Sequence, residues 1–449
     1  MSTWLIDNLL QLMLLLPLAA AVVAVLSRTP PVALAVALTA GVLELVLAAM
    51  AAMALAVGVE LMFISDWVRA GLGLDLALMA GPPRVGAVAA LAFTAGAVAM
   101  WAYRRGALTP ARTALGMLML SAAAGAVMAA DMLLLATFVE AAWLPAVVLV
   151  AASRGPASAG RLMLPCLMVT AALTAGVVWL AWLHCEATGV LSFAHGDLLH
   201  TDEYLAGKAL ATMDMFRTTE PLRLAGWAAV YIVGFASLLA AMRRALSAET
   251  LSGGAKMLAA AHVAFLVLSA ATAALPARDA AVGWSGSHLA ALAFAAVTTG
   301  LAWLGLLACG AYLVRSGRRM AEPQDIRGLA RKYPDVAFAA GICLISLAGL
   351  PLTGGFFARV MLLSSAAGTG ALLAMLLFVP PMIALSATYL SMVLAIAFTG
   401  RPAPHEHISL PGLRGALWRA GIAAVVTALV ILGILPHLLA EPLRMLTGR

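Results

Sequence analysis

The stretch LISLAGLPLTGGFFARVMLLSSA, residues 344–366, has the hydropathy of a membrane helix but contains residues that interrupt one. The interrupting residues are Gly349, Pro351, Gly354 and Gly355. Arg359 follows them among apolar neighbours. Irregular backbone at membrane depth persists only where protein or a water-filled cavity satisfies its polar groups. We therefore expect a broken membrane helix with a fixed charge beside it, as in ion paths and binding sites; the alternative is a proline kink packed against neighbouring helices.

The composition indicates a membrane protein. The 449 residues are 64% hydrophobic and 10% charged, and the mean hydropathy of +1.03 lies far outside the range of soluble domains. Apolar runs of about 20 residues recur, as membrane-spanning helices require, and none alternates like a membrane β-strand. The sequence therefore predicts an all-α polytopic protein that forms a single membrane domain. The run 9–26 lacks a basic flank and a cleavage site, so we interpret it as the first span and not as a signal peptide.

About twelve spans are predicted, and the broken helix is the tenth. They lie at residues 9–26, 31–57, 85–103, 113–130, 132–152, 161–184, 222–242, 254–275, 285–314, 336–365, 371–398 and 417–440. Of the 27 Lys and Arg residues, 17 then fall in inner loops and 8 in outer segments, which agrees with the basic excess expected on the cytoplasmic side. We expect a multi-pass protein of a bacterial-type inner (cytoplasmic) membrane with both termini on the outer side.

Several kinds of site are not indicated. The net charge of +7 comes from basic residues scattered over short loops, which topology explains without nucleic acid. The four cysteines are far apart and suggest neither a disulfide framework nor a metal site, and no dinucleotide fingerprint, P-loop or haem motif implies a cofactor bound by this chain. Two histidine groupings without metal spacing are interpreted as solvated loops: His195, Asp197 and His200, and His405, Glu406 and His407.

Glu140 is the clearest ionisable residue within a span. It stands in DMLLLATFVEAAWLPAVVLV, nine residues after Asp131, which is about 13 Å along a helix and near mid-membrane. Ionisable groups at such a depth cost about 2.5–3.5 kcal/mol on insertion scales and suggest a function by default. A carboxyl there either pairs or is neutral part of the time, as a proton carrier requires. The alternative is a protonated, hydrogen-bonded core glutamate.

Other ionisable residues within spans give less specific signals. Lys256, near the start of its span, could equally extend to the interface, whereas His262, six residues later, could relay a proton. Glu44 and His288 are single polar groups, and we expect each to form hydrogen bonds with a neighbouring helix. Arg359 keeps its proton under all working conditions, so it can hold an anion or set a local field but cannot be a step in a proton relay.

Four segments resemble the antiporter-like membrane subunits of respiratory complex I and related complexes, with the N-type subunit closest. SLAGLPLTGGFFARVMLL is similar to the family signature Ser-Leu-Ala-Gly-hydrophobic-Pro-x-x-x-Gly-Phe-x-x-Lys. The family's acidic helix has Asp-Leu-Leu, a central Glu and a later Pro, which correspond to Asp131, Glu140 and Pro145. ALSAETLSGGAKMLAAAHVAF resembles a third family segment, and GLARKYPDVAFAAGICLISLAG resembles the cytoplasmic approach to the broken helix.

The resemblance implies roles for particular residues. Glu140 is the first titratable site, and His262 keeps its family position. The lysine of the third segment aligns with Ser252, and Lys256 follows one helical turn later on the same face. Arg359 occupies the lysine position of the broken helix. The family's two central lysines, one of them before a Pro-Phe-His-x-Trp-x-Pro motif, have no counterpart, which implies that two of the family's fourteen helices are missing.

The resemblance also implies an organisation of the chain. The expected parts are N-terminal helices at 1–110, a first, truncated repeat at 113–184, an external loop at 185–221, a second repeat with the broken helix at 222–398, and a C-terminal helix at 417–449. The external loop is polar and acidic and stands where the family has two further helices.

By resemblance, we expect a membrane subunit of a complex I-like or hydrogenase-like assembly that translocates protons and is driven by redox chemistry. Its partners would be other membrane subunits, the lipid bilayer and protons, with quinone, flavin and iron–sulfur clusters in partner subunits. Pumping by this chain itself is not implied, because the central lysine helices are absent. The alternatives are a proton-conducting partner of an inorganic-carbon uptake or cation/proton antiporter complex, and a structural, non-conducting subunit.

Overall fold

The structure, a computed structural model, describes residues 8–27, 29–68, 74–188, 221–273, 288–316, 322–326, 329–367, 372–398 and 412–447. The chain divides into two compact units. The first unit consists of Met1–Arg69, Leu74–Cys166 and Phe193–His195, and the second of Ala70–Gly73, Leu167–Ser192 and Gly196–Arg449. Most of the expected external loop at 185–221, and the two histidine groupings, lie outside the described residues.

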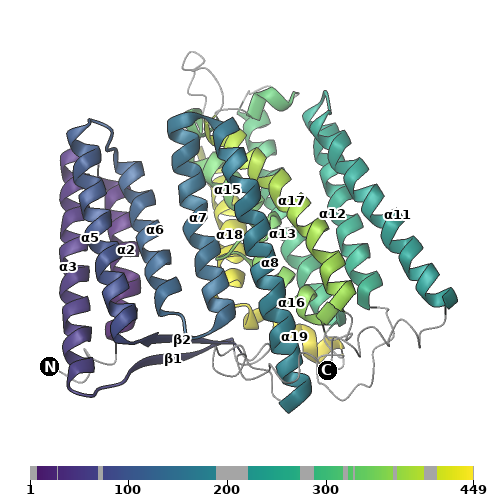
Figure 1. Cartoon of the computed structure of the whole chain (residues 1–449). Helices are drawn as coiled ribbons and strands as arrows, with labels where there is room; N and C mark the ends of the chain where they lie inside the picture. Colours follow the sequence, from purple (N-terminus) through teal and green to yellow (C-terminus); the bar gives the residue numbers. More distant parts are fainter. Residues whose placement is uncertain are drawn as a thin grey trace. The chain divides into compact units, whose positions relative to one another are not determined.

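The first unit is a group of helices with one β-hairpin (Figure 1). Its elements are α2 (Leu9–Leu26), α3 (Pro30–Ala56), β1 (Leu61–Val68), β2 (Leu74–Ala80), α5 (Pro82–Arg104), α6 (Pro110–Met128) and α7 (Met132–Arg154). Helix α8 (Pro156–Thr188) is divided between the units. Proline opens several of these helices at a position where its missing N–H has no helical partner to lose.

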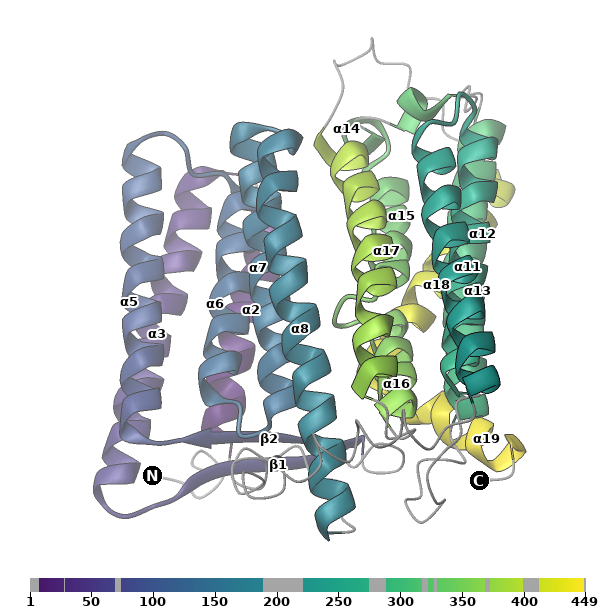
Figure 2. The same cartoon turned by 45° about the vertical axis from the view of Figure 1, so that its right-hand side comes forward.

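The hairpin β1–β2 is a feature that the sequence analysis did not predict. The strands pair antiparallel from Leu61 opposite Ala80, and Figure 2 shows them running across the ends of the helices of the first unit. Leu78 is fully buried in a cluster with Leu9 and Leu10. Residues 61–80 include apolar residues in irregular order, so neither a helical nor a strict two-residue period identified the segment.

The second unit contains the broken helix and its neighbours. Its elements are α11 (Pro221–Leu246), α12 (Leu251–Ala273), α13 (His288–Arg315), a 3-10 turn at Pro323–Ile326, α14 (Leu329–Lys332), α15 (Pro334–Leu347), α16 (Gly354–Ala367), α17 (Leu372–Phe398), α18 (Gly412–Ile434) and α19 (His437–Thr447). Within this unit α13 packs against α12, α15, α16, α18 and α19. The predicted span 417–440 is wrong at its end, because α18 stops at Ile434 and Pro436 separates it from α19.

The predicted class is confirmed as all-α polytopic, with the addition of the hairpin. Among the described residues, ten helices are long and apolar enough to cross a membrane. Each predicted span overlaps a helix, and the predicted broken span 336–365 is divided into α15 and α16 as expected.

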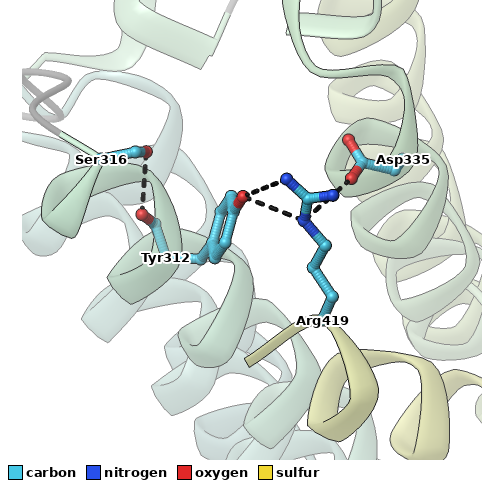
Figure 3. A network of polar contacts seen from close by, with 4 residues as sticks. All are labelled: Tyr312, Ser316, Asp335 and Arg419. Atoms are coloured by element: carbon cyan, nitrogen blue, oxygen red, sulfur yellow. Dashed lines mark hydrogen bonds and ion pairs between the residues drawn. The ribbon is translucent and has the colours of Figure 1, made fainter. Parts of the chain in front are cut away.

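A polar network joins three helices of the second unit at the end where α15 begins (Figure 3). Arg419 of α18 donates from Nε and Nη2 to the Tyr312 hydroxyl of α13, at 3.1 and 3.0 Å. Its Nε also lies 3.8 Å from a carboxylate oxygen of Asp335 on α15, and both charged side chains are more than half exposed. Exposed ion pairs contribute little energy. The hydrogen bonds of Arg419 to the buried Tyr312 therefore contribute most to this contact.

Gly433 provides a first prediction. Helix α18 passes the break so closely that a Cβ on Gly433 would overlap backbone atoms of Leu352 and Thr353. Gly433→Ala is therefore expected to reduce stability by about 1–3 kcal/mol, as overpacking does. Gly421→Ala is the matched control on the same helix, because a Cβ there has nothing within 4 Å. Thermal unfolding in detergent measures both variants, and equal midpoints would contradict the close approach.

Candidate functional site

The break between α15 and α16 is built by a glycine in the left-handed conformation. Gly349 has φ +67°, and its N–H donates to the Ser346 carbonyl at 2.9 Å while the N–H of Leu350 donates to the Ile345 carbonyl at 3.2 Å. This pair of bonds is a Schellman motif, which ends a helix, and Pro351 follows directly. The helix therefore breaks at Gly349 and Pro351, as the sequence predicts, and the break has the backbone geometry of a Schellman motif.

Two side chains complete the hydrogen bonding at the end of α15. The last carbonyls of a helix have no helical donors. Arg359 Nη2 donates to the Leu347 carbonyl at 2.9 Å, and the Ser386 hydroxyl of α17 is 2.8 Å from the Ala348 carbonyl. Arg359 Nη1 also donates to the Ser386 hydroxyl and to the Met382 carbonyl at 3.3 Å. The positive charge of Arg359 also interacts favourably with the negative end of the α15 dipole.

The glycines of the break make room for this arrangement. A Cβ on Gly349 would overlap the Arg359 guanidinium. A Cβ on Gly355 would overlap the Ser346 carbonyl, and the Gly355 N–H donates to the Ser346 hydroxyl at 3.2 Å. Gly354 faces Thr298 of α13 and Leu432 of α18 closely. The broken helix is therefore closely packed against its neighbours, as the packed-kink interpretation expects, and Arg359 caps the end of α15. An ion path at the break remains a prediction.

His262 lies at the centre of a second polar chain in the same unit. It is 5% exposed; its Nδ1 lies 3.2 Å from the Tyr389 hydroxyl of α17, and its Nε2 lies 3.1 Å from the Thr299 hydroxyl of α13. A neutral imidazole donates at one nitrogen and accepts at the other, and hydroxyls can do either. The hydroxyl–imidazole–hydroxyl chain can therefore exist with either direction of hydrogen bonding, which is what a proton relay needs.

A small cavity joins the two polar groups. It is lined by His262, Thr299, Ser346, Gly355 and Arg359 among others, and the space open to the centre of a water molecule is about 10 Å³. A cavity of about 10–15 Å³ on this measure holds one water. The Phe265 ring also connects the two groups: its centroid is 5.8 Å from that of His262 and 6.0 Å from the Arg359 guanidinium carbon.

Glu140 lies in the first unit, on α7. Its side chain is 9% exposed, and Asp131 caps the helix by accepting the N–H groups of Leu133 and Leu134 at 2.7 and 3.0 Å. Pro145, inside the helix, has no N–H to donate to the Ala141 carbonyl one residue after Glu140. The Trp143 indole N–H, in the same turn, is buried with no hydrogen-bond partner among the described residues. The helical turn that begins at Glu140 therefore contains two further buried or unpaired polar groups, the Ala141 carbonyl and the Trp143 indole N–H.

The structure does not gather all the candidates in one place. Lys256 is exposed on α12, whereas His262 on the same helix is buried. His288 begins α13, but its side chain lies outside the described residues. Among the described residues, no group of three or more His, Cys, Asp or Glu side chains could hold a metal ion.

Three side chains that complete the site were missed in the sequence analysis: Thr299, Ser386 and Tyr389. Hydroxyl residues are common in membrane helices because they can bond to their own backbone, as Thr298 does with the Phe294 carbonyl at 3.0 Å. Composition and spacing therefore do not separate Ser386 or Tyr389 from such residues. Only their packing against α12 and α15 does.

Comparison with known proteins supports the sequence resemblance. Residues 205–384 match the family "NADH:quinone oxidoreductase/Mrp antiporter, TM". NADH-quinone oxidoreductase subunit N of Deinococcus radiodurans is 31% identical over 180 residues, which are 40% of this chain and 34% of that protein. Subunit N 1 of Sorangium cellulosum is 29% identical over 177 residues, 39% of this chain and 33% of that protein. The matches thus span about a third of the length of these curated relatives.

Two solved structures cover nearly all of the chain at low similarity. The Mrp complex from Dietzia sp. DQ12-45-1b has 17% identity and a TM-score of 0.40, with 100% of this chain and 97% of that chain covered. Respiratory complex I from Thermus thermophilus has 19% identity and a TM-score of 0.37, with 98% and 100% covered.

The apolar helices and the broken helix define a polytopic helical membrane protein. Residues 205–384 resemble the NADH:quinone oxidoreductase/Mrp antiporter family, and the curated relatives named above are N-type subunits.

Gly349→Ala tests the geometry of the break. Alanine at φ +67° is strained, and its Cβ would displace the Arg359 guanidinium. We expect a loss of about 1–3 kcal/mol of stability, the scale of a strained backbone position. Gly341→Ala on α15 is the control, because a Cβ there meets nothing within 4 Å. Thermal unfolding compares the two; a larger loss for the control would contradict the assignment.

A double-mutant cycle tests the contact between Arg359 and Ser386. Arg359→Lys is expected to fold but to lose about 1–3 kcal/mol, because one ammonium cannot reach both the Leu347 carbonyl and the Ser386 hydroxyl. Combination with Ser386→Ala should be non-additive by about 0.5–3 kcal/mol. Combination of Arg359→Lys with Ser153→Ala, an exposed serine of the first unit, should be additive. Additive losses in both combinations would exclude the direct contact.

Proposed function

We propose that the chain is a membrane subunit of a complex I-like, redox-driven assembly that translocates protons. The observation that carries the proposal is the buried chain from Thr299 through His262 to Tyr389, beside a broken helix whose cation is Arg359. A non-redox membrane subunit would contribute proton binding and transfer. The family match over residues 205–384 and the similarity to N-type subunits support this class.

The residues have different roles in the proposal. Glu140, buried at mid-helix, is the acid of the first unit that takes part in proton transfer. His262 is the relay in the second unit, and the cavity beside it admits about one water. Arg359 holds the end of α15 and sets a fixed positive field, so it takes no part in proton transfer. Lys256, exposed on α12, is at most an entry group at the helix end.

The proposal extends to partners and location. Other membrane subunits, the lipid bilayer and protons are the partners, and quinone, flavin and iron–sulfur clusters belong to partner subunits. The membrane is a bacterial-type inner membrane with both termini outside, as the distribution of basic residues favours. The family's central lysines have no counterpart in this sequence. Protons would therefore cross this chain by a short path, or a helix of a partner subunit would complete the path.

The fixed role of Arg359 favours one alternative, a structural subunit that does not conduct. The guanidinium satisfies the Leu347 and Met382 carbonyls, so the charge at the break has a structural purpose. Proton flux separates the two functions, because a structural subunit would not change flux when its acid is neutralised.

Glu140→Gln in the native complex, reconstituted into proteoliposomes, is the test. We expect proton flux to fall by about 100-fold or more, the scale for removal of a proton-transfer group, with normal assembly. Glu60→Gln, which neutralises an exposed carboxylate after α3, is the control and should conduct normally. A reduced yield of complex with unchanged flux per complex would favour the structural alternative. Co-purifying quinone- and flavin-binding subunits would favour the redox assembly over a carbon-uptake or antiporter complex.

A further inference from the structure

Glu44 in the middle of α3 is an acid that the proposed function does not use. Its side chain is 0% exposed. Neither carboxylate oxygen has a hydrogen-bond partner among the described residues, so the sequence expectation that it satisfies a neighbouring helix is wrong for the described part of the chain. Buried polar groups almost always find a partner, and each exception requires an explanation.

No cation stands near Glu44 on the elements that pack against it. Helix α3 contacts α2, α5, α6 and β1, and α2 carries no ionisable residue. The ionisable residues of the other elements are Arg84, Tyr103 and Arg104 on α5, Arg112 on α6 and Asp66 on β1. The helical ones stand near helix ends, where Arg84 donates to the Met128 and Ala129 carbonyls and Arg112 to the Ala107 carbonyl. Ion pairing therefore does not explain Glu44.

Glu44 lies in a layer between two apolar clusters of the first unit. One cluster contains Met13 of α2, Ala48 of α3 and Ala124 of α6. The other contains Ala20, Ala40 and Leu120 of the same three helices. The residues between the clusters are therefore Glu44 on α3, buried Pro17 on α2 and Ser121 on α6.

Glu140 on α7 lies at the level of this layer to within about one helical turn, or ~5.4 Å along the helix axis. Gly125 of α6 faces Phe138 of α7, and the two helices run antiparallel from their short connection. One turn further from that connection, Ser121 stands at about the level of Glu140. Helix α6 packs against both α3 and α7, so the Ser121 hydroxyl lies on the helix between the two acids.

Backbone acceptors accompany these side chains. Pro17 and Pro145 lack N–H groups and so leave the Met13 and Ala141 carbonyls without their helical donors. The Ser121 hydroxyl already donates to the Leu14 carbonyl at 2.8 Å. The layer thus combines two buried acids with a hydroxyl and two carbonyls that lack the usual helical donor, inside helices that are otherwise apolar.

We propose that Glu44 is a proton-binding site: a neutral carboxylic acid at the level of Glu140 whose proton exchanges with water through this polar layer. An ionised carboxylate without a partner in such a site would cost many kcal/mol, so the group holds a proton instead. This extends proton binding into the three N-terminal helices, on the far side of α6 from Glu140. The inference does not depend on the redox assembly or on proton flux.

Infrared spectroscopy of the full chain in lipid vesicles tests the proposal. A protonated carboxyl has a carbonyl stretch separate from that of a carboxylate, and it moves to lower frequency when deuterium replaces the proton. We expect a protonated-carboxyl band that belongs to Glu44 to be present near neutral pH beside any band from Glu140, to shift in D₂O, and to disappear in Glu44→Gln. Glu60→Gln, which removes an exposed acid, should leave the band unchanged, and Glu44→Asp should move it without removing it.

The outcomes are distinct. Identical carbonyl regions for the wild type and Glu44→Gln across the pH range would show that Glu44 is not protonated and would overturn the proposal. A band that belongs to Glu44 but does not shift in D₂O would show a sealed structural acid, which also overturns it. Glu44→Leu is the folding control, since removal of a buried polar group without a partner should raise the unfolding midpoint. None of these results depends on whether Glu140→Gln changes flux.

Discussion

The constraint on which the second unit depends is that every backbone polar group exposed by a broken helix must be satisfied inside the membrane. The end of α15 meets it in two ways: Gly349 and Leu350 bond back to their own helix, and Arg359 and Ser386 bond the Leu347 and Ala348 carbonyls. Gly349 is needed for packing as well as for its backbone conformation, because a larger residue there would occupy the volume of the Arg359 guanidinium. The charge that first suggested an ion site is therefore also a helix cap.

The same arrangement positions the candidate relay. Helix α17 supplies Ser386 to the break and Tyr389, one turn later, to His262. Fixing α17 against α15 thus also fixes one of the two hydroxyls that flank the imidazole. The other, Thr299, comes from α13, which packs against both halves of the broken helix. Because α17 carries both Ser386 of the helix cap and Tyr389 of the relay, substitutions at these two neighbouring positions should affect stability and proton transfer respectively.

The two acids of the first unit illustrate a different balance. Glu140 stands in a helix that also contains Pro145 and the buried Trp143 indole N–H. Glu44 stands between two apolar clusters, with no hydrogen-bond partner in the part of the chain that the structure describes. Burial without a partner favours the proton-bound form of an acid. The unit therefore places acids of unlike surroundings at a similar level, with Ser121 on the helix between them.

The sequence by itself determined the spans and the position of the break, because hydropathy, Gly349 and Pro351 act locally along the chain. It also identified Glu140, His262 and Arg359 as buried ionisable residues. It did not identify the hairpin at 61–80, the helix end at Ile434 or the partners Ser386 and Tyr389. Tertiary structure decided those partners, and the isolation of Glu44, because they depend on which surfaces of distant helices meet, and hydropathy contains no information about that.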